Sequence, residues 1–198
     1  VGRLHPVINY NSCIKCGICY KVCPSIDSEN IIYKRLDSLS EPFYGDVVKC
    51  YTGKSKNENV YKNSQSGGLL TQLLIYLFSK RLITHAIVVR MNYGNPPRPE
   101  CYFALSIKDL LSSQKSIYNP INVLTSLRDL KKIDGSFALV GLPCHIEGYE
   151  SLYRYNNENF NKIKYKIGLI CDGLLSFSSV DFFAKRVKIK EDFKIIYR

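Results

Sequence analysis

Phe137-Ala138-Leu139-Val140, followed directly by Gly141-Leu142-Pro143-Cys144, is the stretch of this sequence that decides the fold. Four apolar residues ended by turn residues predict a short strand that is buried on both faces. Pro143 is well suited to the first turn of a helix, where its missing N–H group has no partner to lose. A doubly buried strand that leads into a helix is typical of an α/β layer with a mostly parallel sheet.

Similar patterns continue on both sides of this stretch. Leucines at helical spacing predict an amphipathic helix from Gly67 or Gly68 to about Lys80. Residues 52–63 are expected to be a polar loop. We expect further strands at residues 47–51, 86–89, 102–105, 166–170 and 193–198, and further helices at residues 108–112 and 123–131. Strands that alternate with helices in this way predict the α/β class, with helices flanking a mostly parallel sheet.

The composition of the 198 residues fits a folded protein, with 45% hydrophobic and 23% charged residues. The lysines and arginines behind the net charge of +11 are spread along the chain, which indicates a solvated basic surface or an acidic cofactor or partner, and not nucleic acid. The longest apolar stretch, residues 69–78, is interrupted and falls short of the ~20 residues that span a membrane. With no transmembrane segment and no secretory signal in sight, we expect a cytoplasmic protein.

Four of the eight cysteines lie in one run near the start of the chain, Cys13-Ile14-Lys15-Cys16-Gly17-Ile18-Cys19-Tyr20-Lys21-Val22-Cys23-Pro24. The run fits C-x2-C-x2-C-x3-C-P at every fixed position, which is the bacterial ferredoxin pattern for a 4Fe-4S cluster. Gly17 permits the tight turn between thiolates, and Pro24 turns the chain away after the last one. A zinc site is the alternative, although zinc ligands favour C-x2-C pairs set well apart.

The remaining thiols are candidates for further ligands. Cys144 and Cys171 each follow a predicted strand, and in a parallel sheet the carboxyl ends of the strands line the ligand crevice, so both would point toward one region. Each is a cluster ligand, a reactive thiolate or a buried structural cysteine. Cys101 fits the structural role better, and Cys50 fits either. Cys23 either closes the first cluster or leaves its completion to these distant thiols, so one cluster is expected and the eight cysteines would suffice for two.

A glycine turn precedes the leucine-rich helix, in Ser64-Gln65-Ser66-Gly67-Gly68. Hydroxyl groups and bare backbone N–H groups at a helix start make a cradle for phosphate, and Thr71 adds a hydroxyl one turn later. A serine that merely caps the helix is the alternative interpretation. Neither a G-x-G-x-x-G fingerprint nor a P-loop motif occurs, so the common dinucleotide and triphosphate sites are disfavoured.

Taken in order, the ferredoxin run, Ser66-Gly67-Gly68-x-x-Thr71, Gly141-Leu142-Pro143-Cys144 and Gly168-Leu169-Ile170-Cys171 resemble the family of coenzyme F420 hydrogenase/dehydrogenase beta subunits. The resemblance covers nearly the whole chain. It implies an iron–sulfur flavoprotein in which FAD passes electrons between 4Fe-4S clusters and an organic partner, often coenzyme F420. It also implies further redox subunits as partners.

The resemblance assigns cofactor-binding roles by position. Around the FAD phosphates or ring it places Ser64, Ser66, Gly67, Gly68 and Thr71. The segment Ser116-Ile117-Tyr118-Asn119-Pro120 is similar to a family segment beside the flavin, usually Ser-Lys-Tyr-x-Pro, and so assigns Ser116, Tyr118 and Asn119. Two departures remove cations from this region. Ile117 stands where the family has lysine, and Tyr61-Lys62 stand where it often has arginine, which leaves the second substrate open.

Two units and one function follow from these observations. Residues 1–45 are expected to form a small ferredoxin-like 4Fe-4S segment. Residues 46–198 are expected to form a flavin-binding α/β domain that continues beyond Arg198. The absence of a starting Met also suggests that residue 1 is not the biological start. The expected enzyme is an oxidoreductase that exchanges a hydride between F420 and FAD and single electrons with the clusters. No catalytic side chain is named, and His145 is either structural or a hydrogen-bond donor to a sulfur or the flavin. A ferredoxin-dependent reductase of another organic substrate and a non-catalytic electron-transfer subunit are the alternatives.

Overall fold

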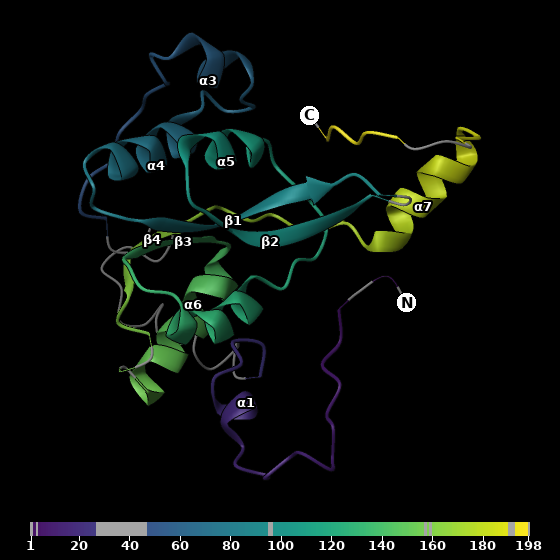
Figure 1. Ribbon diagram of the computed structural model, residues 1–198. Coiled ribbons are helices and arrows are strands. Elements are labelled where there is room, and N and C mark those ends of the chain that lie inside the picture. Colours follow the sequence, from purple (N-terminus) through teal and green to yellow (C-terminus); the bar gives the residue numbers. More distant parts are fainter. Residues whose placement is uncertain are drawn as a thin grey trace.

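A four-stranded sheet with the strand order β2-β1-β3-β4 organises the molecule (Figure 1). The computed structural model describes residues 2, 4–26, 47–94, 97–156, 158, 160–189 and 193–197. The strands are β1 (His85–Asn92), β2 (Arg98–Ala104), β3 (Phe137–Gly141) and β4 (Ile163–Gly168). β1, β3 and β4 run parallel, and β2 pairs with β1 in the antiparallel sense. The expectation of a mostly parallel sheet is therefore confirmed.

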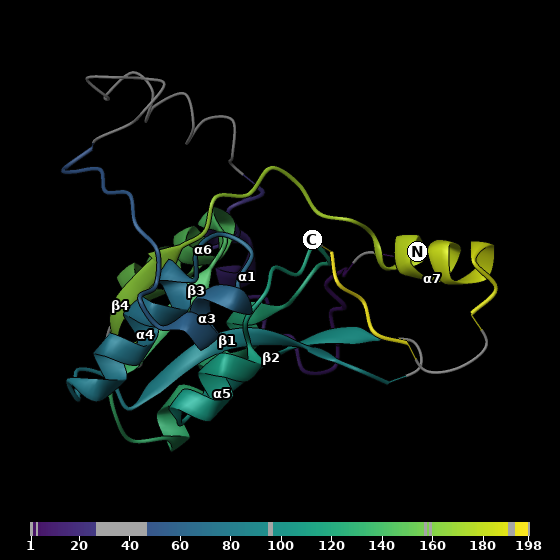
Figure 2. The ribbon, with the colours of Figure 1, turned by 90° about the horizontal axis from the view of Figure 1, so that it is seen from above.

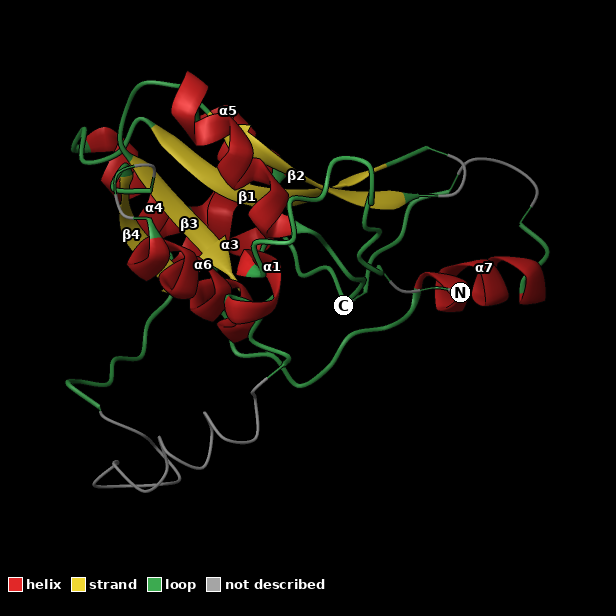
Figure 3. Ribbon diagram, turned by 90° about the horizontal axis from the view of Figure 1, so that it is seen from below, coloured by secondary structure: helices red, strands yellow, loops and turns green. Residues whose placement is uncertain are grey.

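Helices cover both faces of this sheet (Figure 1). On one face lie α4 (Leu69–Ser79) and α5 (Ile107–Ser112), and on the other lie the 3-10 helix η1 (Val123–Lys132) and α6 (Pro143–Tyr155). Outside these layers the structure has α1 (Ile18–Lys21), α3 (Glu58–Lys62) and α7 (Phe177–Arg186). Figures 2 and 3 show α7 standing beyond the ends of β1 and β2, and Figure 3 shows α1 beside α6.

The central strand β3 explains why the core has two halves. Every residue of β3 is buried, as the apolar run predicts. Ala138 and Val140 belong to the cluster that includes α4 and α5, whereas Phe137 and Leu139 belong to the cluster that includes η1 and α6. The alternation follows from the two-residue period of a strand. β3 therefore joins the two helical layers into one α/β unit.

Three strand expectations differ from the structure because a strand needs a neighbour to pair with. Residues 47–51 are exposed and form no strand, and the described residues 193–197 are also irregular. The strand expected at residues 166–170 begins earlier, at Ile163, and ends at Gly168. It lies at the edge of the sheet, so its residues alternate between covered and exposed, and it is not buried on both faces.

Two further expectations are corrected by local contacts. The polar loop expected at residues 52–63 contains α3, because the Asn57 side chain caps its first turn and accepts hydrogen bonds from the N–H groups of Asn59 and Val60. The helix expected at residues 123–131 has the 3-10 form. Among the described residues no helix is long and apolar enough to cross a membrane.

Candidate functional site

The ferredoxin run forms an open loop around the short helix α1. Gly17 caps this helix with a φ of 72°, a left-handed conformation that glycine adopts without strain. Cys13, Cys16 and Cys19 are exposed and Cys23 is half-buried. In the described parts of the chain no three Cys, His, Asp or Glu side chains converge on one point. Four thiols on this spacing are nevertheless the donor set that suits a 4Fe-4S cluster, so these residues fit the group.

The end of this run is packed on α6. A Cβ atom added to Gly148 would lie 3.7 Å from Cδ of Pro24, an ordinary contact distance, and 2.8 Å from Cδ1 of Leu124, so the glycine is required by the packing of α6 on η1. Cys144 lies four residues before Gly148 and therefore on the same face of α6. The structure thus brings the ferredoxin run to the helix that carries Cys144, a contact that no local pattern in the sequence predicts.

Cys144 and Cys171 lie at equivalent places on two neighbouring parallel strands. Gly141 of β3 pairs with Gly168 of β4, and each cysteine follows its glycine by three residues. The N–H of Leu169 donates to the carbonyl of Gly141 at 2.9 Å and extends this pairing past the end of β4. Partial burial raises the pKa of the Cys144 thiol, while a hydrogen bond with the His145 backbone acts in the opposite direction and the nearby Cys171 adds a smaller upward shift. Both thiols therefore lie at one edge of the sheet, as predicted.

His145 has a structural partner beside Cys144. The N–H of Leu142 donates to Nδ1 of His145 at 3.2 Å, which holds the turn between β3 and α6. Burial lowers the pKa of this imidazole, while a hydrogen bond with the Ile121 backbone acts in the opposite direction. A neutral ring can accept at Nδ1, so His145 serves as a cap for α6.

The two other cysteines differ from this pair. Cys101 lies on β2, where it is half-buried and its Sγ donates to the carbonyl of Val123 at 3.8 Å. Burial raises the pKa of this thiol to about 11. Such a thiol is inert at neutral pH, in line with the structural role expected for it. Cys50 is exposed on the irregular segment that leads to α3.

Gly67 and Gly68 form a tight turn before α4. Gly67 and Gly68 have φ values of 79° and 72°, both left-handed. A Cβ on Gly68 would lie 2.9 Å from Cγ1 and 3.1 Å from the carbonyl oxygen of Val60. On Gly67 it would lie 3.3 Å from Cβ of Lys54, whose ammonium group stands 4.9 Å above the ring of Tyr61. Both glycines make room for the protein's own chain, and the backbone N–H groups at the start of α4 suit a phosphate group, so the turn fits the FAD that the sequence suggests.

The hydroxyl groups predicted for this turn have different surroundings. Oγ of Ser64 donates to the carbonyl of Tyr61 at 2.7 Å and so closes α3. Ser66 is exposed, and Thr71 is half-buried in the first turn of α4. Of the three, Ser64 thus has a clear structural bond within the protein.

The segment that holds Ser116 meets the glycine turn, although the two are about fifty residues apart in sequence. The N–H of Ser116 donates to Oε1 of Gln65 at 2.6 Å. Gln114 adds two bonds, donating to the carbonyl of Val60 at 3.1 Å and accepting from Asn63 at 3.0 Å. The structure therefore joins two segments that the sequence assigns to one cofactor.

The next residues of this segment, Tyr118 and Asn119, are bonded to the residues that precede α7. The carbonyl of Tyr118 accepts from the N–H of Leu175 at 2.6 Å. The Asn119 side chain is 2% exposed and donates to the carbonyls of Leu175 and Ser176 at 3.3 and 3.4 Å. Contacts of this kind between distant segments carry no sequence signal.

The topology puts these parts along one edge of the sheet. Only a short connection separates the end of α4 at Ser79 from the start of β1 at His85, so α4 runs back along the sheet and its glycine turn lies at the carboxyl edge of the parallel strands (Figure 1). The N-terminus of α6 lies at the same edge on the opposite face, because α6 follows β3 directly. A sulfur-rich side and a glycine-rich side therefore share the edge where α/β proteins bind ligands.

A ferredoxin-type cysteine run docked on an α/β layer defines an iron–sulfur protein of the redox class, and a model of a 4Fe-4S binding domain matches residues 5–32. The model described as coenzyme F420 hydrogenase/dehydrogenase, beta subunit N-term, matches residues 50–128, and its C-terminus counterpart matches residues 134–196. The chain belongs to the family of coenzyme F420 hydrogenase/dehydrogenase beta subunits.

Individual relatives agree with this family. The chain is 30% identical over 187 residues to the uncharacterized protein MJ1349 of Methanocaldococcus jannaschii, covering 90% of this chain and 48% of the relative. It is 33% identical over 175 residues to the coenzyme F420-dependent sulfite reductase of the same organism, covering 78% and 25%. It is 25% identical over 142 residues to coenzyme F420 hydrogenase subunit beta of Methanosarcina barkeri, covering 67% and 47%. The chain thus spans about half or less of these relatives.

A solved structure shares the fold. A chain of the F420-reducing [NiFe] hydrogenase complex from Methanosarcina barkeri superposes with a TM-score of 0.68 at 20% identity. The similarity covers 74% of this chain and 52% of that one. At this identity the likeness concerns the fold alone.

Proposed function

We propose that this chain is the iron–sulfur flavoprotein part of an oxidoreductase that exchanges electrons between coenzyme F420 and 4Fe-4S clusters by way of FAD. The observation that carries the proposal is the shared carboxyl edge, where the glycine turn of α4 and the thiols that follow β3 and β4 lie on either side of one sheet. Relatives named for F420-linked hydrogenase and sulfite reductase activities support the choice of substrate.

In this proposal each side of the edge holds one cofactor. Residues 1–45 carry the first 4Fe-4S cluster on Cys13, Cys16, Cys19 and Cys23, and residues 46–198 form the flavin unit. Cys144 and Cys171 are further thiolate ligands beside it. FAD, when bound, converts a two-electron hydride transfer into single-electron steps. The residues that we assign to its binding are Ser64, Ser66, Gly67, Gly68, Thr71, Ser116 and Tyr118, and Asn119 belongs to the same segment as the last two.

The chain's own groups favour anionic cofactors. Backbone N–H groups at the start of α4 attract the phosphates of a dinucleotide. The net charge of +11 also suits F420 or an acidic electron carrier. Other redox subunits are the partners we propose, since two of the relatives are themselves named as subunits of an F420 hydrogenase and of an F420H2 dehydrogenase.

The visible absorption spectrum of the anaerobically purified protein, before and after addition of reduced F420, tests the proposal. We expect flavin bands on a broad iron–sulfur shoulder, and we expect both to bleach when reduced F420 is added. If the flavin bands do not bleach, F420 is not the substrate, and a ferredoxin-dependent reductase of another organic substrate becomes the better interpretation. An iron–sulfur spectrum without flavin would favour a non-catalytic electron-transfer subunit, and zinc in place of iron would overturn the proposal.

A matched pair of cysteine variants sharpens the cluster assignment. Cys16→Ser is expected to lose iron and the absorption shoulder, because it removes one thiolate of the four. Cys101→Ser is the control, since this thiol lies on β2 against Val123 and has no part in the proposed site. Equal iron content in the two variants would contradict the assignment.

A further inference from the structure

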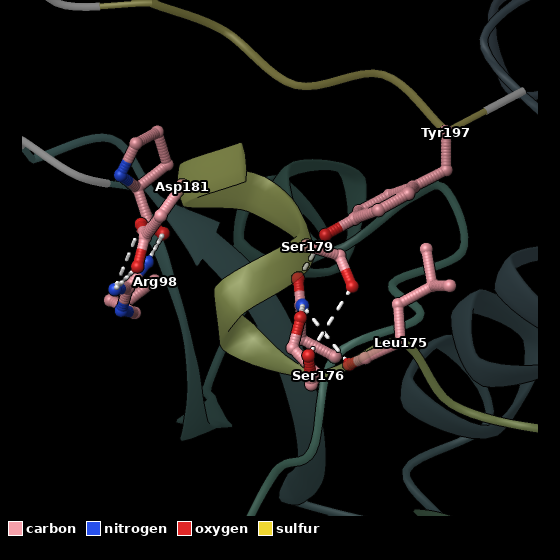
Figure 4. A network of polar contacts seen from close by, with 8 residues as sticks. Arg98, Leu175, Ser176, Ser179, Asp181 and Tyr197 are labelled. Atoms are coloured by element: carbon pink, nitrogen blue, oxygen red, sulfur yellow. Dashed lines mark hydrogen bonds and ion pairs between the residues drawn. The ribbon is translucent and has the colours of Figure 1, made fainter. Parts of the chain in front are cut away.

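Three segments that are distant in the sequence meet at the buried amide of Asn119. Its Nδ2 donates to the carbonyls of Leu175 and Ser176, which precede α7, and its Oδ1 accepts a hydrogen bond from the hydroxyl of Tyr197. Figure 4 shows the Tyr197 hydroxyl pointing toward the start of α7, where Leu175, Ser176 and Ser179 lie. Burial raises the pKa of Tyr197, so its hydroxyl remains a donor at neutral pH.

These bonds occupy the Asn119 side chain inside the protein. A buried amide can donate two hydrogen bonds and accept others at its oxygen, and here both ends already have partners. With 2% of the residue exposed, little of its surface is left for a cofactor. Any effect of Asn119 on the flavin must therefore pass through a neighbour.

Tyr118 is that neighbour. Its carbonyl accepts from the N–H of Leu175 at 2.6 Å, and its ring stands edge-on to the ring of Tyr197 with centroids 5.5 Å apart. Two residues earlier, Ser116 is bonded to Gln65 of the glycine turn. The segment is thus held at Ser116 by the turn and at Asn119 by α7, which leaves the ring of Tyr118 between two fixed points.

Helix α7, which holds the Asn119 end of this segment, is itself bonded to the sheet. Arg98 of β2 forms an ion pair with Asp181 at 3.3 Å (Figure 4). The guanidinium of Arg98 also stands 5.2 Å above the ring of Phe177. The N–H of Phe177 donates to the carbonyl of Gly2 at 2.8 Å. These contacts fix the carbonyls to which Asn119 donates.

We propose that Asn119 and Tyr197 are positioning residues that hold the ring of Tyr118 at the flavin site, and that Asn119 does not itself contact the flavin. The inference rests on the proposed flavin function. It predicts that breaking the Asn119–Tyr197 bond changes the flavin environment even though neither side chain touches the cofactor. It also adds Tyr197, a residue more than one hundred positions from the glycine turn, to the groups on which the site depends.

FAD titrations of the full chain, followed by flavin fluorescence under anaerobic conditions, test this inference. Tyr197→Phe keeps the ring but removes the hydroxyl, and we expect it to raise the Kd for FAD about threefold to tenfold. Asn119→Ala removes all three bonds and should raise the Kd at least about tenfold. Tyr155→Phe is the matched control, because Tyr155 is an exposed tyrosine at the end of α6, and its Kd should stay unchanged.

A core variant separates positioning from general stability. Leu127→Ala opens a cavity in the η1 core and should lower the melting temperature without moving the Kd for FAD by more than about twofold. At saturating FAD, the visible circular dichroism of the flavin should change in Tyr197→Phe and not in Leu127→Ala, because only the first variant alters the surroundings of Tyr118.

The outcomes distinguish this inference from the function on which it rests. If the wild-type chain binds no FAD, the proposed function fails, and the inference fails with it. If the wild type binds FAD and both Tyr197→Phe and Asn119→Ala bind it equally well with an unchanged dichroism, the function stands and the positioning role is overturned. The positioning role is also overturned if Leu127→Ala alters Kd and dichroism as much as the two variants do.

Discussion

At the scale of single residues, Gly68 is a position where the backbone conformation and its neighbours require glycine. It combines a left-handed φ with a carbonyl oxygen 3.1 Å from where a Cβ would lie. We expect Gly68→Ala to lower the free energy of unfolding by about 1–3 kcal/mol, since both strain and contact oppose the methyl group. Chemical denaturation monitored by far-ultraviolet circular dichroism measures this change.

Gly53→Ala provides the control for Gly68. The nearest atom to its Cβ would be Cδ1 of Leu69 at 3.9 Å, an ordinary contact. The free energy of unfolding should change by less than about 0.5 kcal/mol. Equal losses in the two variants would show that the left-handed turn is not what makes Gly68 indispensable.

Cys101 supplies a prediction on pH. Burial raises the pKa of its thiol from the ordinary 9.0 to about 11, so the folded state holds the proton more tightly than the unfolded state. This contribution to stability is complete below about pH 9 and is lost as the pH rises toward 11. Between pH 8 and 10.5 the wild type should therefore lose about 2 kcal/mol more stability than Cys101→Ala.

Denaturant unfolding of both proteins at several pH values measures this difference. Tyrosines and lysines that titrate in the same range affect both proteins alike, so only the difference between the two curves reports on the thiol. Parallel curves would mean that Cys101 ionises as easily in the folded state as in the unfolded one.

At the scale of secondary-structure elements, α6 begins with an arrangement that the motif alone does not reveal. His145 accepts the N–H of Leu142, and Gly141 leaves room for that imidazole, since a Cβ there would lie 2.9 Å from Cβ of His145. The side chain that caps α6 is thus that of His145, which lies three residues after Leu142. The turn that presents Cys144 depends on this bond.

His145→Ala should lower the free energy of unfolding by about 0.5–2 kcal/mol, the range for loss of a helix cap. His5→Ala, at an exposed position near the N-terminus, should leave stability unchanged. Thermal unfolding at pH 7.5 compares the two variants. A His145→Ala protein as stable as the wild type would mean that water replaces the imidazole as acceptor at no cost.

At the scale of the whole molecule, the ferredoxin run is docked on the α/β unit without adding a buried helix to its core. α1 has no buried residue, and Pro24 at the end of the run lies against Gly148 of α6. We therefore expect Cys19→Ser to lose iron while the unfolding free energy of the α/β unit changes by less than about 1 kcal/mol.

Iron analysis and far-ultraviolet melting curves of the same samples test this expectation. The wild type should show loss of the iron–sulfur absorption and loss of helix as two events, and Cys19→Ser should retain the second. If loss of the cluster instead unfolds the α/β unit, the two parts are one cooperative body.

Short-range patterns account for the parts of the fold and site that could be predicted. The buried run of β3, the leucine spacing of α4 and the spacing of the thiols from Cys13 to Cys23 each depend on residues within one or two turns of chain. The alternating β4 and the irregular residues 47–51 and 193–197 were not predictable in the same way. Whether an apolar run becomes a central strand, an edge or no strand depends on which segments lie beside it.

The chemical groups of this protein follow from its amino-acid order: a ferredoxin cysteine run, two glycines before a helix, and the motifs that mark its family. The way in which these parts meet depends on the folded chain, which brings Ser116 to Gln65, Pro24 to Gly148, and Asn119 between α7 and Tyr197. The two differ because they depend on interactions over different distances along the chain. Local spacing sets backbone conformation and ligand geometry, whereas contacts between distant segments form only when the whole core brings them together.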